Sequence, residues 1–207
     1  MMNHQFVGFV VILCSLLLLP SCSEQRPPLN ELSREAVVVA FGDSLTYGTG
    51  AKDHESYPHQ LAKLIDREVI NEGVPGELSG EGRQRLPNVL DEHQPELLIL
   101  CHGGNDLLRK KNPESIVNNL KSMIGEAKRR GIQVLLIAVP EPALFFMEPA
   151  SFYIAVAQSE NIPLLQNTLR DIENDDGLKS DAIHPNAAGY RKLAEAVARL
   201  LQSAGAL

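Results

Sequence analysis

Four short apolar runs, separated by helical segments, constrain the fold of this chain more than any other feature of its sequence. They are AVVVAF at 36–41, REVINEG at 67–73, ELLILC at 96–101 and IQVLLIAV at 132–139. Their β-branched content and their lack of strict alternation are typical of strands that are buried on both faces. We therefore predict four strands of one buried sheet.

The segments between these runs have the signals of helices. Residues 56–67 repeat apolar positions at helical spacing, residues 113–130 begin with Pro-Glu and close at Gly131, and residues 187–203 form a last amphipathic stretch. Strands that alternate with helices imply right-handed crossovers and a parallel sheet. The prediction is an α/β fold, a three-layer α/β/α sandwich with a central, mostly parallel sheet.

The N-terminal segment indicates export. Residues 6–19 are almost wholly apolar, at about the length of a signal-peptide core and too short to span a bilayer comfortably. The run ends in Leu-Pro-Ser-Cys, which resembles a bacterial lipobox with Cys22 as the lipidated first residue of the mature protein. This predicts a signal peptide over 1–21, a polar tether over 22–35 and one domain over 36–207. A cleaved secretory signal and an uncleaved anchor are the alternatives.

The predicted location is the cell envelope, on the periplasmic side. Ser23, rather than an aspartate, follows Cys22, which favours the outer membrane if the source is Gram-negative. Cys14 leaves with the signal peptide and Cys22 would carry lipid, so Cys101 remains alone and no internal disulfide is expected. We expect Cys101, at the end of an apolar run, to be a buried small hydrophobe.

Length and charge narrow the class of protein. The chain has 207 residues, of which 44% are apolar and 22% charged, and its formal net charge is -7. This balance is typical of one folded domain. The acidic charge and the lack of a long basic stripe exclude nucleic acid as a partner.

Two segments far apart in the chain carry the residue types of nucleophilic catalysis. FGDSLTYG at 41–48 follows the first predicted strand and places Ser44 where that strand ends. DAIHPNAAG at 181–189 supplies Asp181 and His184. A serine hydroxyl needs a base to take its proton, and that base needs a carboxylate to fix its tautomer. Pro185 restricts His184 to an extended backbone, so local geometry presets the pair.

Two further segments complete a family pattern. NEGVPGELS at 71–79 and GGND at 103–106 each follow a predicted strand. The four segments, in this order across residues 36–203, resemble the SGNH or GDSL hydrolase family, and within it the bacterial periplasmic arylesterases, thioesterases and lysophospholipases. The resemblance implies a flavodoxin-like sheet.

The resemblance also implies a role for each matching residue. It makes Ser44 the nucleophile, with Asp181 and His184 as its partners in a catalytic triad. It places the backbone amides of Ser44 and Gly76 and the side-chain amide of Asn105 in the oxyanion hole. Chemistry favours these groups independently, because fixed donors without bulk suit a developing negative charge. The sequence departs from the family at Glu77 and Leu78, positions often held by Asp and Thr, which leaves the local loop contacts open.

The implied function is a serine esterase that hydrolyses small-molecule esters or thioesters through an acyl-enzyme, without a metal or organic cofactor. The sequence indicates no protein partner and predicts membrane contact only through lipid at Cys22. Two alternatives remain, a carbohydrate O-acetylesterase and a non-catalytic envelope lipoprotein that keeps the fold. Retention of all five candidate positions argues against the second.

Three other features of the sequence could suggest a functional role: His102, Asp43 and the stretch 143–147. His102 lacks a second His or Cys at metal-ligand spacing. Asp43 is expected to support the turn before Ser44 rather than to act as an acid or base. The stretch 143–147 (ALFFM) either lines an acyl-binding groove or covers the core, and the sequence does not separate these readings.

Overall fold

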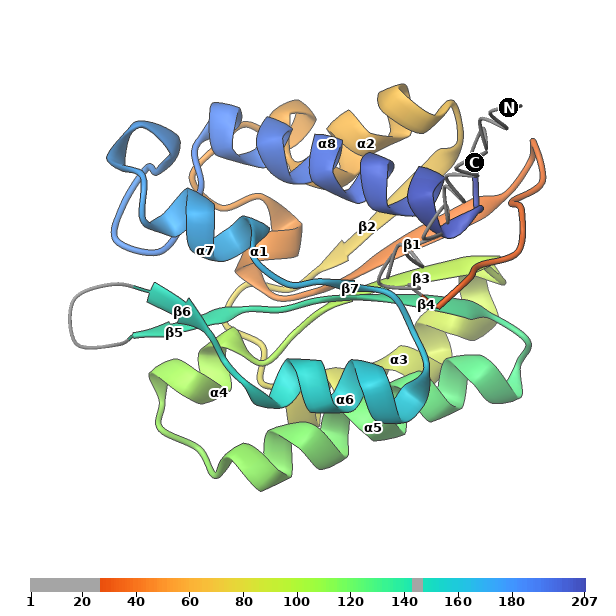
Figure 1. The fold of residues 1–207 in the computed structure, drawn as a ribbon, viewed down its shortest axis with the longest axis horizontal. Helices are drawn as coiled ribbons and strands as arrows, with labels where there is room; N and C mark the ends of the chain where they lie inside the picture. The colour runs from red at the N-terminus through yellow and green to blue at the C-terminus, as the bar shows by residue number, and fades with distance from the viewer. Residues whose placement is uncertain (1–26, 143–146) are drawn as a thin grey trace, which may run out of the picture.

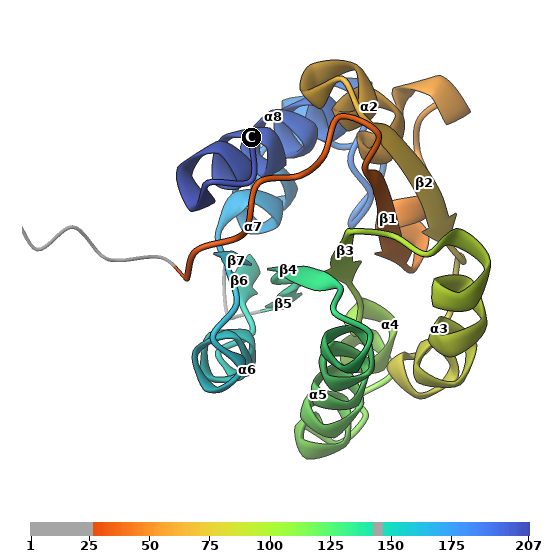
Figure 2. The same cartoon turned by 90° about the vertical axis from the view of Figure 1, so that its right-hand side faces the viewer.

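The centre of the protein is a five-stranded parallel sheet with the strand order β2-β1-β3-β4-β7 (Figures 1 and 2). The computed structural model describes residues 27–142 and 147–207. The four predicted strands are present, and β7 adds a short fifth one at the edge. The predicted burial on both faces is wrong for β2, an edge strand with no buried residue. The strands are β1 Val37–Gly42, β2 Glu68–Gly73, β3 Leu97–Cys101, β4 Gln133–Ile137 and β7 Leu164–Leu165.

Helices cover both faces of this sheet, which confirms the predicted three-layer sandwich. Figure 1 shows one group above the sheet, α1 Ser44–Tyr47, α2 Tyr57–Ile65, α7 Thr168–Glu173 and α8 Ala187–Ala204. The group below the sheet is α3 Ser79–His93, α4 Gly104–Leu108, α5 Pro113–Arg129 and α6 Phe152–Glu160. Two 3-10 turns, η1 Asp53–Glu55 and η2 Asp176–Leu178, lie in the loops.

Local sequence signals explain the ends of the predicted helices. Asn112 caps α5 by accepting a hydrogen bond from the Glu114 N–H at 2.9 Å, and Pro113 occupies the first turn, where its missing N–H costs nothing. Gly131 follows this helix with φ at +75°, a conformation that favours glycine. Asn186 caps α8 in the same manner, accepting from the N–H groups of Ala188 and Gly189.

Several elements were not expected from the sequence, among them α3 and a small antiparallel pair of strands. Helix α3 contains Gly80, Gly82 and Pro87, which weaken helical propensity, but it buries Leu86 and Leu90 against the fold. Strands β5 Pro140–Pro142 and β6 Met147–Pro149 form a small antiparallel pair after the sheet. Of the stretch 143–147, only Met147 belongs to the described residues.

The described part of the expected tether packs onto the domain, which differs from the prediction that the folded unit begins at residue 36. The N–H groups of Leu29 and Leu32 donate to the carbonyls of Ala204 and Ala206, at 2.8 and 2.9 Å. Leu32 is buried in the core. Backbone hydrogen bonds and the buried Leu32 side chain therefore hold residues 29–32 against the C-terminal end of the chain.

The signal peptide and Cys22 lie outside the described residues, so their assignments stay predictions. In residues 27–142 and 147–207, no helix combines the length and apolar character needed to cross a membrane. Cys101 is fully buried in β3, as expected, and burial raises the pKa of its thiol well above the usual range.

Candidate active site

Ser44 lies at a tight turn from β1 into α1. Gly42 ends the strand, and a Cβ there would lie only 2.0 Å from the Cys101 carbonyl oxygen, so only glycine fits. Asp43 is buried, and its side chain accepts a hydrogen bond from the Leu45 N–H at 3.1 Å. Asp43 therefore caps the short helix, as predicted, and Ser44 takes the first helical position, whose N–H has no partner within the helix.

Asp181 and His184 form a pair within one turn. One Asp181 oxygen accepts from the backbone N–H groups of Ile183 and His184, both at 2.9 Å. The other oxygen lies 2.8 Å from His184 Nδ1. Burial by itself would raise the pKa of Asp181, but these hydrogen bonds lower it to about 2. Asp181 is thus a carboxylate at neutral pH and fixes the Nδ1–H tautomer of His184.

The fold brings this pair to Ser44 from 140 residues away. His184 Nε2 lies 3.0 Å from Ser44 Oγ, and with Nδ1 protonated it is positioned to accept the hydroxyl proton. The arrangement is a continuous hydrogen-bonded series from Asp181 through His184 to Ser44. Ser44 is half-buried, and this series gives it the geometry of an activated nucleophile.

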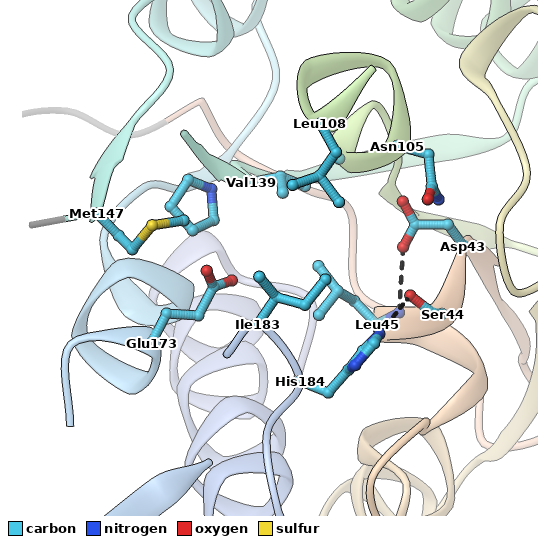
Figure 3. A pocket seen from close by; sticks show the side chains of 12 residues that line it. Asp43, Ser44, Leu45, Asn105, Leu108, Val139, Met147, Glu173, Ile183 and His184 are labelled. Atoms are coloured by element: carbon cyan, nitrogen blue, oxygen red, sulfur yellow. Dashed lines mark hydrogen bonds between the residues drawn. The ribbon is translucent and has the colours of Figure 1, made fainter. Parts of the chain in front are cut away.

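Ser44, His184 and Asn105 line one pocket (Figure 3). Asn105 comes from the start of α4, and its Nδ2 donates to the Glu77 carbonyl oxygen at 3.2 Å. Gly76, on the loop between β2 and α3, is not among the residues that line this pocket. Its φ is +83°, and a Cβ added to it would meet nothing within 4 Å. The loop therefore leaves open space at Gly76, next to the peptide that Asn105 contacts.

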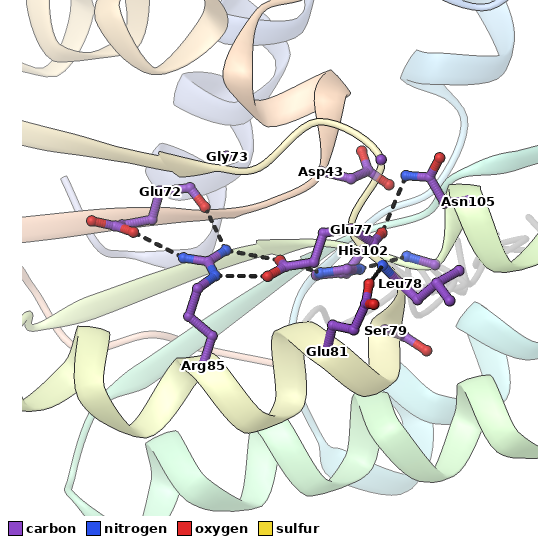
Figure 4. Close-up of polar contacts among 12 residues, drawn as sticks. Asp43, Glu72, Gly73, Glu77, Leu78, Ser79, Glu81, Arg85, His102 and Asn105 are labelled. Carbon is purple, nitrogen blue, oxygen red and sulfur yellow. Dashed lines mark hydrogen bonds and ion pairs between the residues drawn. The ribbon is translucent and has the colours of Figure 1, made fainter.

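The contacts of Glu77, a residue that departs from the family pattern, explain its presence in the structure (Figure 4). Both Glu77 oxygens accept from Arg85, at 2.8 and 2.9 Å, and one lies 3.0 Å from His102 Nε2. Arg85 also pairs with Glu72 at 2.9 Å and lies 4.1 Å above the ring of Phe41. Burial by itself would raise the pKa of Glu77, but the bonds from Arg85 and His102 lower it to about 2. The network anchors the loop that carries Gly76.

His102 belongs to this network rather than to a metal site. The Gly103 N–H donates to its Nδ1 at 3.1 Å, so Nε2 carries the hydrogen that Glu77 accepts. Across the described residues, no group of three or more His, Cys, Asp or Glu side chains has the arrangement to hold a metal ion.

Two acidic residues near the site were not singled out from the sequence. Asp106 is buried and accepts from the Ser79 N–H and hydroxyl, both at 2.8 Å, which ties the start of α3 to α4 beside Asn105. Its position next to Asn105 in GGND was the available signal. Glu173, at the end of α7, lines the pocket and is buried. No local pattern marked it, because α7 reaches the pocket only through the tertiary fold.

Known proteins resemble this chain in both sequence and structure. Residues 40–192 match the GDSL-like Lipase/Acylhydrolase family. The chain is 31% identical to Esterase TesA of Pseudomonas aeruginosa over 82% of this chain and 89% of that protein. It is 29% identical to Thioesterase 1/protease 1/lysophospholipase L1 of Escherichia coli K12, over 80% and 83% of the two chains.

A solved crystal structure of TesA superposes with a TM-score of 0.73 at 29% identity, covering 81% of this chain and 99% of that one. The sequence match spans both Ser44 and His184, and the structural match extends over most of the sandwich. The chain therefore belongs to the GDSL-like lipase/acylhydrolase family of ester hydrolases.

Proposed function

We propose that this protein is a serine esterase that cleaves carboxylic esters or thioesters through an acyl-enzyme intermediate on Ser44. The observation that carries the proposal is the series from Asp181 to His184 to Ser44, with contacts of 2.8 and 3.0 Å, at the edge of a pocket. A serine at hydrogen-bond distance from a histidine that is itself oriented by a carboxylate is the arrangement that activates a hydroxyl.

The first half of the reaction forms the acyl-enzyme. Ser44 Oγ attacks the carbonyl carbon while His184 Nε2 takes the hydroxyl proton, and Asp181 stabilises the imidazolium that results. The carbon–oxygen or carbon–sulfur bond then breaks, and His184 returns the proton to the leaving alcohol or thiol. In the second half, water attacks the acyl carbon while His184 Nε2 takes one of its protons. The bond between the acyl carbon and Ser44 Oγ then breaks, His184 returns the proton to Oγ, and the acid leaves.

The negative charge that develops on the carbonyl oxygen needs fixed donors. The Ser44 N–H is available because it is the first amide of α1. The Gly76 N–H and the Asn105 side-chain amide are the other two donors in this proposal. Asn105 donates to the Glu77 carbonyl through a long bond, which a stronger acceptor would displace.

The pocket supports a substrate with an acyl or alkyl group of modest size. Apolar side chains line most of it: Leu45, Leu108, Val139, Pro140, Met147 and Ile183. The names of the relatives point to esters and thioesters as the two bonds to compare. We further propose that the enzyme works in the cell envelope, held to the membrane by lipid on Cys22, with the outer membrane as its site in a Gram-negative cell.

Paired variants test the mechanism. Ser44→Ala and His184→Ala are each expected to lower kcat by about 10⁴-fold or more, and the double variant to be hardly slower than either, because the residues act as a unit. Ser115→Ala and His59→Ala, exposed residues of the same types on α5 and α2, serve as controls. Labelling by a fluorophosphonate probe, together with p-nitrophenyl ester hydrolysis, measures the outcome. Independent, additive losses would show that Ser44 and His184 do not share one mechanism.

A substrate panel tests the reaction class. We expect hydrolysis of p-nitrophenyl esters of short to medium acids and of the matching acyl thioesters by the full-length enzyme. Turnover of an acetylated sugar alone would favour the carbohydrate O-acetylesterase instead. A protein that neither turns over any of these compounds nor reacts with the fluorophosphonate would contradict the proposal and favour the non-catalytic lipoprotein.

A further inference from the structure

One carboxyl group interrupts the apolar wall of the pocket. Glu173 is the last residue of α7, is only 4% exposed, and lines the same pocket as Ser44 and His184. Figure 3 shows its carboxyl directed between Met147 and Ile183. Among residues 27–142 and 147–207, none donates a hydrogen bond to this carboxyl or forms an ion pair with it.

The buried position of the Glu173 carboxyl does not stabilise the fold. A buried polar group without a partner costs free energy, and an acidic side chain at the C-terminal end of a helix faces the negative end of the helix dipole. The carboxyl of Glu77, in contrast, is matched by Arg85 and His102. A buried carboxyl that the protein leaves unmatched beside a reactive serine is available to a ligand.

Burial favours the neutral form of Glu173. Burial raises the pKa of Glu173 to about 8, Lys179 opposes this rise, and Asp43 adds to it. Lys179 lies 2.9 Å from Asp176, so its charge is already paired. His184 also lines the pocket, but its ring nitrogens contact Asp181 and Ser44. A protonated carboxyl both donates and accepts a hydrogen bond, which suits a hydroxyl group better than a cation or an anion.

We propose that Glu173 is a specificity-determining residue that selects esters bearing a hydroxyl group on the part of the substrate that fills this pocket. The inference rests on the proposed esterase function. Apolar neighbours such as Val139 and Ile183 would contact the carbon chain, and the Glu173 carboxyl would accept from and donate to the hydroxyl. An unsubstituted chain leaves the carboxyl unmatched, and a carboxylate chain meets no lysine or arginine among the described residues that line the pocket.

The test compares p-nitrophenyl esters of straight-chain acids with their ω-hydroxy, ω-ammonio and ω-carboxylate counterparts, over a short range of chain lengths. The full-length enzyme is compared with Glu173→Gln and Glu173→Leu, and Glu148→Gln, at an exposed residue of β6, is the control. We measure the ratio of kcat/KM for the hydroxylated and the plain ester. A hydrogen bond of this kind should make the ratio in the wild type roughly five- to tenfold at its best chain length, which converts to about 1–1.4 kcal/mol.

Glutamine is neutral and also donates and accepts, so Glu173→Gln should keep most of the preference, while Glu173→Leu should lose it. In the wild type the ratio should rise as pH increases through about 8, where Glu173 loses its proton, because a carboxylate accepts a stronger hydrogen bond from the hydroxyl and is costlier to leave unmatched; Glu173→Gln should show no such rise. A purely structural role for Glu173 would not move this ratio with pH.

Three results would overturn the inference. Equal ratios in the wild type and Glu173→Leu, with all esters hydrolysed, would reject selection by Glu173 and leave the esterase function intact. A preference for the ω-ammonio ester that Glu173→Gln abolishes would show a carboxylate that binds cations instead. No hydrolysis of any ester by the wild type would reject the esterase function and this inference with it.

Discussion

Asn105 provides the sharpest test of the proposed oxyanion hole, because its structural role and its catalytic role predict different magnitudes. From a half-buried position, its side-chain Nδ2 donates to the Glu77 carbonyl oxygen at 3.2 Å. Asn105→Ala removes this bond and should lower the free energy of unfolding by about 1 kcal/mol. If the amide also donates to the oxyanion, the same change should lower kcat by about 10²–10³-fold, equivalent to ~2.7–4 kcal/mol, with KM little changed.

A matched control separates the two effects. Asn119 lies on α5, and its Nδ2 donates to Ser79 Oγ at 3.0 Å, also from a half-buried position, but it does not line the pocket. Asn119→Ala should therefore lower the melting temperature by a similar amount and leave kcat near the wild-type value. The assay is ester hydrolysis per active site, with the active sites counted by fluorophosphonate titration, alongside thermal unfolding of each variant. A destabilised Asn105→Ala enzyme with normal kcat would remove Asn105 from the oxyanion hole.

Two further predictions concern the loop of Gly76 and the N-terminus. Glu77→Gln removes the charge that Arg85 and His102 contact, and should lower the free energy of unfolding by about 2–3 kcal/mol at neutral pH. Because the pKa of Glu77 is lowered from 4.5 to about 2, this stabilisation is present above pH 4.5 and is lost as pH falls through about 2. Denaturation curves across this range should therefore converge for the two proteins at low pH, and a constant difference would contradict the assignment. Cys22→Ser should release the protein from the membrane fraction, and an unchanged membrane fraction would reject the lipid anchor.

Much of the fold follows from local sequence. Strands β1, β3 and β4 follow from continuous apolar runs because strands buried on both faces need them, whereas the edge strand β2 has no buried residue. Helix α5 begins at Pro113 and ends before Gly131 because capping and backbone preference act within a few residues. Helix α3 could not be predicted from local sequence, because its glycines and Pro87 oppose helix formation. Its packing against the sheet outweighs this effect.

In the candidate site, too, local sequence predicted some contacts, while others depend on tertiary packing. The contact of Asp181 with His184 depends on a turn of a few residues, so the spacing in DAIHP was enough to predict it. The sequence also placed Ser44 and Asn105 after strands, and such residues meet at the carboxyl ends of parallel strands. Their distances to one another depend on how β1, β3 and α8 pack, and no local pattern encodes these distances.

The side chains that surround the candidate site could be identified only from the tertiary structure. The role of Glu77 as the partner of Arg85 and His102 depends on a side chain of α3 meeting the residue that follows β3. Glu173 enters the pocket because α7 packs beside α8, far along the chain from Ser44. Local patterns determine which segments form strands, helices and turns, because those preferences act over a few residues. Burial and pairing of a carboxyl depend on segments that are distant in sequence, so they appear only when the chain is folded.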